Sequence, residues 1–172
     1  MVLINEKKGR VMRPILIGTF TLLLTVSAPL PAHETATKTS QSGALSTPAR
    51  GAAAAVDAFH AAIDRGDTRA AAALLAEDAL IFESGGAERT KAEYAAHHLA
   101  ADAEFSRSVS SVVTRRSGNA SGTLAWVASE GRTTGTYKGK PLDLLTTETM
   151  LLRRTNGAWK IVHVHWSSAA KR

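Results

Sequence analysis

The sequence predicts an α+β domain in which three N-terminal helices pack against a curved antiparallel sheet. Between residues 52 and 105, apolar side chains recur at the spacing of a helix face. Between residues 107 and 168, four long segments rich in alternating and β-branched residues are separated by turn sequences. A helical half followed by a meander of strands favours two layers, with the helices covering one face of the sheet.

The first two helices are marked by an apolar stripe and by their ends. The first helix spans about residues 52–65, and Gly66 ends it. Its stripe consists of side chains at i, i+3, i+4 and i+7, which are Val56, Phe59, His60 and Ile63. Because the stripe is apolar, we interpret His60 as a core or edge histidine. Asp67 is a good N-cap for a second helix over residues 68–77.

A short strand, a third helix and a meander complete the domain. The apolar run at 79–82 predicts a strand that ends in the turn 83–86. Thr90 and Glu93 form a capping box for a helix that continues to about Phe105. The strands of the meander are expected at 107–116, 122–137, 142–154 and 158–167. Between them lie three hairpin-type turns, which are Ser117-Gly118-Asn119, Lys138-Gly139-Lys140-Pro141 and Thr155-Asn156-Gly157.

Residues 1–32 have the pattern of a signal peptide. Four basic residues precede an apolar run at 15–26, and these 12 residues are too few to cross a bilayer, which takes roughly 20 helical residues. Cleavage after Ala32 would export the protein to the periplasm or the medium of a bacterial cell, and an uncleaved anchor is the alternative. Membrane contact is expected only through this segment. Residues 33–51, rich in Ser, Thr and Ala, predict a flexible linker before a domain at 52–168.

The composition excludes several functional classes. After residue 32 the chain has 17 basic and 14 acidic residues, and they are scattered, so nucleic-acid binding has little support. The absence of cysteine excludes disulfides and thiolate metal sites. No phosphate loop, nucleotide fingerprint or nucleophile motif is present, and we expect no cofactor.

The most informative segment is the last predicted strand, which reads AWKIVHVHWSS. Residues two apart in a strand share a face and stand about 6.6–6.8 Å apart, so His163, His165 and Ser167 lie together. We expect the two imidazoles to line a pocket, while Val164 and Trp166 pack on the opposite face of the strand.

The third predicted helix contributes a second polar group. On a helical wheel, His98 and Asp102 fall within about 80° of Tyr94 and therefore share its face. The alternative for this pair is a hydrogen bond on the helix surface. Glu83 closes the first strand, and Glu148 interrupts the apolar run of the third meander strand. We predict that these side chains face the histidine pair across one site.

Four features resemble the nuclear transport factor 2-like superfamily, and within it the exported bacterial SnoaL-like domains of unassigned function. They are the helical opening, the strand ending in FESGG, the helix EYAAHHLAADAEF and the final W-K-I-V-H-x-H-x-S. The ending is also similar to the association domain of calcium/calmodulin-dependent kinase. The resemblance implies a cone-shaped α+β barrel, open at one end, whose curved antiparallel sheet encloses a pocket. It also implies a homodimer that forms through the sheet. Thr147 stands where related domains often have Arg, which argues against a carboxylate-binding pocket.

Three functions fit these residues, and we favour the first while leaving enzymatic activity open. The first is a pocket for an unknown small molecule, with acid–base chemistry suited to an isomerase, cyclase or dehydratase. Its catalytic candidates are His98, Asp102, His163 and His165, and its ligand-binding candidates are Glu83, Tyr94, Glu148 and Ser167. The second is a mononuclear metal site built on the His-x-His strand. The third is a non-catalytic oligomerisation module.

Overall fold

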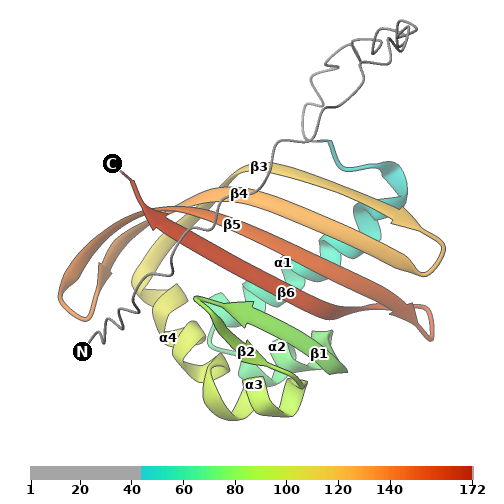
Figure 1. The fold of residues 1–172 in the computed structure, drawn as a ribbon, viewed down its shortest axis with the longest axis horizontal. Coiled ribbons are helices and arrows are strands. Elements are labelled where there is room, and N and C mark those ends of the chain that lie inside the picture. Colours follow the sequence, from blue (N-terminus) through green and yellow to red (C-terminus); the bar gives the residue numbers. More distant parts are fainter. Residues whose placement is uncertain (1–43, 172) are drawn as a thin grey trace, which may run out of the picture. The chain divides into compact units, whose positions relative to one another are not determined.

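The computed structural model describes residues 44–171 and confirms the predicted α+β class (Figure 1). In chain order the elements are a 3₁₀ turn η1 (Thr47–Ala49), helices α1 (Arg50–Asp64) and α2 (Thr68–Leu74), strands β1 (Leu75–Glu83) and β2 (Gly86–Glu88), helices α3 (Lys91–His97) and α4 (Leu99–Ser108), and strands β3 (Val109–Ser121), β4 (Leu124–Tyr137), β5 (Lys140–Thr155) and β6 (Ala158–Ala170). The predicted signal peptide lies outside the described residues, so export stays a prediction.

The six strands form one mixed sheet in the order β2-β1-β6-β5-β4-β3. Strands β3 to β6 form the predicted antiparallel meander, but β1 pairs with β6 in parallel, for example at Phe82 and His165. The sheet is therefore mixed, because β1 joins the predicted antiparallel meander in parallel. A parallel pair needs a long crossover connection, and here α3, α4 and the meander provide it.

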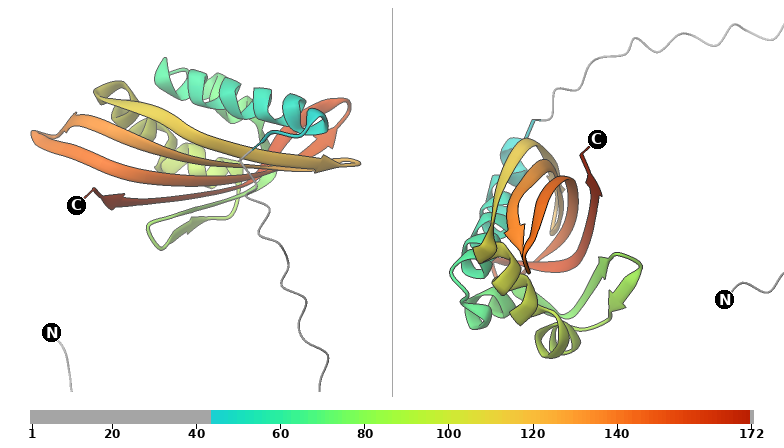
Figure 2. Two further views of the ribbon diagram at one scale, coloured as in Figure 1. Left: turned by 90° about the horizontal axis from the view of Figure 1, so that it is seen from above. Right: turned by 90° about the vertical axis from the view of Figure 1, so that its left-hand side faces the viewer.

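Helix α1 runs along one face of the curved sheet, which we call the inner face (Figure 2). The core lies in this layer, where Phe59 of α1 is buried together with Val127, Met150 and Val164 of the strands. The opposite, outer face carries half-exposed apolar side chains, among them Leu151. None of the helices within residues 44–171 has the length and hydropathy needed to cross a bilayer.

The predicted third helix is two helices, because the chain leaves helical geometry at His98, where φ is −114°. The break has a structural consequence. In an unbroken helix Tyr94 and Asp102 would lie about 12 Å apart along the axis. Here α3 and α4 meet at an angle, and the Tyr94 hydroxyl donates a hydrogen bond to Asp102 at 2.6 Å.

The predicted turn at Ser117-Gly118-Asn119 is wrong, since β3 continues to Ser121. Gly118 instead leaves room for neighbouring segments of the chain to lie close to the strand. A Cβ at Gly118 would lie 2.8 Å from the carbonyl oxygen of Trp126 and 3.1 Å from the Leu45 side chain. Leu45 forms an isolated parallel β-bridge with Gly118, and the Ser46 amide donates a hydrogen bond to the Gly118 carbonyl oxygen at 3.0 Å. Residues 45–49, which the sequence predicts as part of a linker, thus pack against β3.

We therefore expect Gly118→Ala to lower the free energy of unfolding by about 1–3 kcal/mol, because the added methyl group collides with backbone that cannot move alone. Chemical denaturation measures the change. Ser121→Ala, at the exposed end of the same strand, is the control and should leave stability unchanged. An unaltered Gly118→Ala protein would contradict the close approach of Trp126 and Leu45 to Gly118.

Candidate functional site

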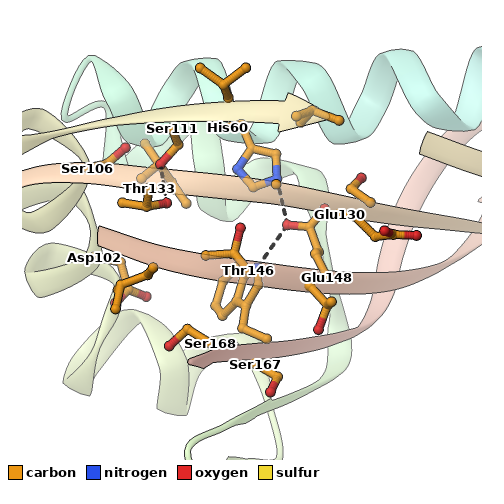
Figure 3. A pocket seen from close by; sticks show the side chains of 18 of the residues that line it. His60, Asp102, Ser106, Ser111, Glu130, Thr133, Thr146, Glu148, Ser167 and Ser168 are labelled. Atoms are coloured by element: carbon orange, nitrogen blue, oxygen red, sulfur yellow. Dashed lines mark hydrogen bonds and ion pairs between the residues drawn. The ribbon is translucent and has the colours of Figure 1, made fainter. Parts of the chain in front are cut away.

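A cavity of about 430 Å³ lies between the inner face of the sheet and helices α1 and α4 (Figure 3). Strands β3 to β6 supply its floor, α1 and α4 supply its walls, and the turn after β1 closes one end. Hydroxyl side chains are frequent in the lining, and Ser111 and Thr133 bond to each other at 2.8 Å. The lining therefore combines hydroxyl groups with apolar side chains such as Phe105 and Leu144.

One row of cross-strand neighbours carries most of the ionisable chemistry of the floor. Successive residues in the row are paired in register across five strands, and they are Arg116 of β3, Ser129 of β4, Glu148 of β5, Trp166 of β6 and Glu83 of β1. All five line the cavity. Because paired residues on adjacent strands lie about 4.5–5.5 Å apart, the row places these side chains side by side.

Glu148, at the centre of the row, accepts two hydrogen bonds on the same oxygen. His60 Nε2 of α1 lies 2.7 Å from Glu148 Oε2, and Trp166 Nε1 donates to that oxygen at 2.8 Å (Figure 3). The Glu148 side chain is only 10% exposed, whereas His60 is 37% exposed. The other carboxylate oxygen, Oε1, is buried without a hydrogen-bond partner among the described residues.

The contact between His60 and Glu148 shifts the pKa of each group in the direction that favours its charged form. Burial opposes the imidazolium, but the hydrogen bond and the charge of Glu148 outweigh it and raise the pKa of His60 above its usual value. Burial likewise opposes the carboxylate, yet the hydrogen bonds from His60 and Trp166 hold the pKa of Glu148 below its usual value. The two directions agree, and both describe an ion pair reinforced by a hydrogen bond.

A second contact between α1 and the floor lies one helical turn away. Asp57 precedes His60 by three residues and therefore projects from the same side of α1. Its carboxylate pairs with Arg116, whose Nε also donates to Ser129 Oγ at 3.0 Å. Helix α1 thus contacts the row at two residues of opposite charge, at Glu148 through His60 and at Arg116 through Asp57.

Asp102 and Glu83 form the carboxyl-rich end of the cavity. Burial raises the pKa of Asp102, against the hydrogen bond from Tyr94, which favours the carboxylate. Burial and then the charge of Asp102 raise the pKa of Glu83. Nearby, His98 bonds to Glu88 through Nδ1 and lies largely exposed. This end therefore holds protons to a higher pH than free carboxyl groups do.

The structure brings together half of the residues that the sequence proposed for the site. Glu83, Asp102, Glu148 and Ser167 line the cavity. Tyr94 is buried behind the wall and holds Asp102, while His98 lies outside the lining.

His163 and His165 do not line the cavity, which corrects the expectation that they form its back wall. They do share a face, as the alternation of a strand requires, but that face is the outer one. Val164 is buried on the inner face between them. His163 Nδ1 lies 2.9 Å from the carbonyl oxygen of Leu80, and Phe82 contacts both rings edge-on. The pair therefore binds β6 to β1.

The sequence reasoning missed His60 and Arg116. The apolar stripe of α1 predicts His60 as a core or edge residue, and the strand pattern marks Arg116 only as the end of a strand. Glu148 could have indicated the role of His60, because a carboxylate in an apolar strand requires a partner from the layer that covers the strand. Within residues 44–171, no group of three or more His, Asp or Glu side chains is arranged to hold a metal ion.

We expect Glu148→Gln to lower the free energy of unfolding by about 1–2 kcal/mol near pH 5.5, a value reduced from that of a buried charged hydrogen bond because water screens His60. The lowered pKa of Glu148 gives stability that is lost as pH falls below 4.5. The raised pKa of His60 gives stability that is lost as pH rises beyond 6.5. Denaturant titrations at pH 3.5, 5.5 and 9 should show the largest difference at pH 5.5. Glu104→Gln, at an exposed position on α4, is the control, and a difference that does not vary with pH would contradict the ion pair.

Comparison with known proteins places this geometry in a family. A family model described as the SnoaL-like domain matches residues 52–171. A crystal structure from Shewanella frigidimarina, provisionally named a ketosteroid isomerase, is 35% identical, with a TM-score of 0.68, and the match covers 72% of this chain and all of that one. No curated protein matches the chain.

Two further solved structures share the fold at lower identity. One is a provisionally named calcium/calmodulin-dependent protein kinase II association domain from Xanthomonas campestris, with 23% identity, a TM-score of 0.61 and coverage of 76% of this chain and 96% of that one. The other is a provisionally named dehydratase of the NTF2-like family from Streptomyces avermitilis, with 18% identity, a TM-score of 0.61 and coverage of 72% and 97%. The chain belongs to the SnoaL-like domain family of NTF2-like proteins.

Proposed function

We propose that this domain binds a small molecule in the cavity and transfers protons to or from it. One observation carries the proposal: a single cavity is lined by the His60–Glu148 pair and by Asp102, which Tyr94 holds from behind the wall, and the pKa values of these groups are shifted in different directions. Acid–base catalysis needs a base and an acid that differ in this way around one bound molecule.

His60 is the better base. Glu148 accepts the hydrogen bond from Nε2, so the carboxylate fixes the tautomer that carries its proton there. When the ring is neutral, the other nitrogen, Nδ1, keeps its lone pair, and ring geometry directs it away from Glu148 (Figure 3). A carboxylate behind the ring also makes the imidazole more basic, as the raised pKa of His60 reflects.

Asp102 is the better acid. Its raised pKa leaves a larger fraction protonated than for an exposed aspartic acid, and Tyr94 holds one oxygen by a bond of 2.6 Å. The other oxygen is available to donate a proton toward the cavity. Removal of a proton next to a carbonyl group and loss of water both require such a pair. The similar structures named as an isomerase and a dehydratase support this class of reaction.

The test is exchange of hydrogen for deuterium next to the carbonyl of cyclic ketones, from cyclohexanone to a 3-ketosteroid, followed by NMR in heavy water. The wild-type chain should accelerate exchange for at least one ketone, and His60→Gln should lower that rate by about 10²–10⁴-fold. His97→Gln removes an exposed histidine of α3 outside the lining and should have no effect. Equal rates for wild type and His60→Gln would refute the assignment of the base.

We also propose that the outer face of the sheet pairs with a second copy of the chain. Trp126 and Leu151 are cross-strand neighbours there, 41% and 42% exposed, and His163 is the next residue in the same row. Apolar side chains gathered on one face favour burial against a partner. Similar structures named as kinase association domains support assembly of this fold.

We expect the wild-type chain to sediment as a dimer and Leu151→Glu to sediment as a monomer, because a carboxylate would be buried without a partner at the contact. Val113→Glu changes an apolar side chain that is 52% exposed but pairs with Gly131 on the inner face and lines the cavity, and it should remain dimeric. A monomeric wild type, or equal assembly of both variants, would contradict this interface. Analytical ultracentrifugation distinguishes the outcomes.

A further inference from the structure

We propose that Arg116 and Ser129 bind one ligand oxygen that gains negative charge, as a ketone oxygen does when the neighbouring carbon loses a proton. This role rests on the proposed function, because it assumes that His60 removes such a proton from a bound carbonyl compound. It adds the groups that receive the charge. It also narrows the ligand class to carbonyl compounds whose oxygen lies against β3 and β4 of the cavity floor.

The first observation is an unused donor on a cation in that floor. Arg116 lines the cavity, and its side chain is only 16% exposed. Its Nε donates to Ser129 Oγ at 3.0 Å and its Nη1 donates to Asp57, while Nη2 has no hydrogen-bond partner within residues 44–171. In this part of the chain, Glu148 Oε1 is the one fully enclosed side-chain polar atom without a partner, so Nη2 stays accessible to a ligand or to water.

The second observation is how another arginine of the same sheet uses its guanidinium. Arg132 binds the Asp143 carboxylate through Nε and Nη2, both at 2.6 Å, so these two nitrogens form one edge of the group. On Arg116 the Nε of this edge is taken by Ser129, and Nη2 remains. The vacant position therefore suits a single oxygen better than a carboxylate, which binds an arginine best through both nitrogens.

Ser129 supplies a second donor beside Nη2. It lines the cavity, is only 8% exposed, and its Oγ accepts the hydrogen bond from Arg116. The hydroxyl hydrogen is thus available to donate, and no acceptor within residues 44–171 is bonded to it. Donors fixed in a site that excludes most water stabilise an oxyanion far more than water-exposed donors do. The guanidinium and the hydroxyl together therefore form a site for an oxygen that acquires charge.

The third observation is the position of this site beside the base. Ser129 separates Arg116 from Glu148 in the row of paired residues, and Glu148 bonds to His60. Asp57, which holds the guanidinium, lies one helical turn from His60 on α1. Burial and their mutual hydrogen bond have the larger influence on the pKa values of His60 and Glu148, and the charge of Arg116 acts on both groups after them. The same helix and the same row therefore position the base and the cation.

These positions define a balanced proton transfer. The C–H bond next to the carbonyl group breaks, its proton passes to His60 Nδ1, and its electron pair forms a C=C bond. The carbonyl oxygen then bears the negative charge and accepts hydrogen bonds from Arg116 and Ser129. Return of a deuteron from the imidazolium, after its proton has exchanged with heavy water, gives the labelled ketone. A neutral ketone avoids the repulsion that the carboxylates of the lining exert on an anion, and its charge develops only beside Arg116.

The first test is ketone exchange by Arg116→Gln. The rate should fall by about 10²-fold, with little change in the ketone concentration that gives half the maximal rate, because a neutral oxygen gains less from the cation than an oxyanion does. Arg116→Lys keeps the charge without the planar fork, so its rate should lie between those of the wild type and Arg116→Gln. Arg115→Gln is the matched control and should exchange like the wild type, since the preceding side chain lies on the opposite face of β3 beside Glu130.

This comparison separates the role of Arg116 from the proposed chemistry. Loss of exchange in His60→Gln together with a wild-type rate in Arg116→Gln would overturn the role of Arg116 and leave the base in place.

A second probe, 4-nitrophenol, tests the site without any reaction. Its phenolate is a planar analogue of an enolate and is yellow, so absorbance reports the ionisation of the bound molecule. When it is bound to the full-length wild-type chain, the ratio of phenolate to phenol should be about tenfold higher than in Arg116→Gln at the same pH. That result without ketone exchange would refute the proposed chemistry and support the oxyanion site. Equal ratios in the two proteins, or no binding to the wild type, would overturn the site.

Discussion

The carboxylate of Glu148 lies where α1 crosses the sheet, and the packing of that helix depends on how the carboxylate is satisfied. A charged group enclosed to this degree is strongly unfavourable unless partners replace its water. His60 from the helix and Trp166 from the next strand supply those partners on one oxygen. The buried apolar stripe of α1, with Val56 and Phe59, and the bond from His60 together set the rotation of the helix. Asp57, one turn earlier, then falls onto Arg116.

The same constraint separates the two ends of the cavity chemically. Near α1, a cation and a carboxylate stabilise each other, and the pKa of Glu148 is lowered. Near α4, carboxyl groups are buried beside one another, and the pKa values of Glu83 and Asp102 are raised. Environments that move similar groups in opposite directions are a common basis for acid and base roles in one site. The two ends of the cavity therefore differ in how readily their side chains hold protons, a difference that the hydroxyl groups of the lining alone would not produce.

Much of this fold could be predicted from local patterns, but the site could be predicted only in part. The helix stripes, the capping box at Thr90 and the alternation in the strands depend on neighbours in sequence. The predictions failed where contacts between residues distant in sequence determine which way a side chain faces. Alternation shows that His163 and His165 share a face, but the packing of α1 determines that Val164 faces inward instead. The same helix turns His60 from a stripe residue into the partner of Glu148.

The central claim is that Glu148 sets the charge of His60 at the cavity wall, and an NMR titration of the His60 imidazole tests it directly. In the wild-type chain the pKa of His60 should lie above 6.5, since the carboxylate outweighs burial. In Glu148→Gln the pKa should fall below 6.5, because burial then acts without the opposing charge. A His60 pKa that is the same in both proteins would contradict the account.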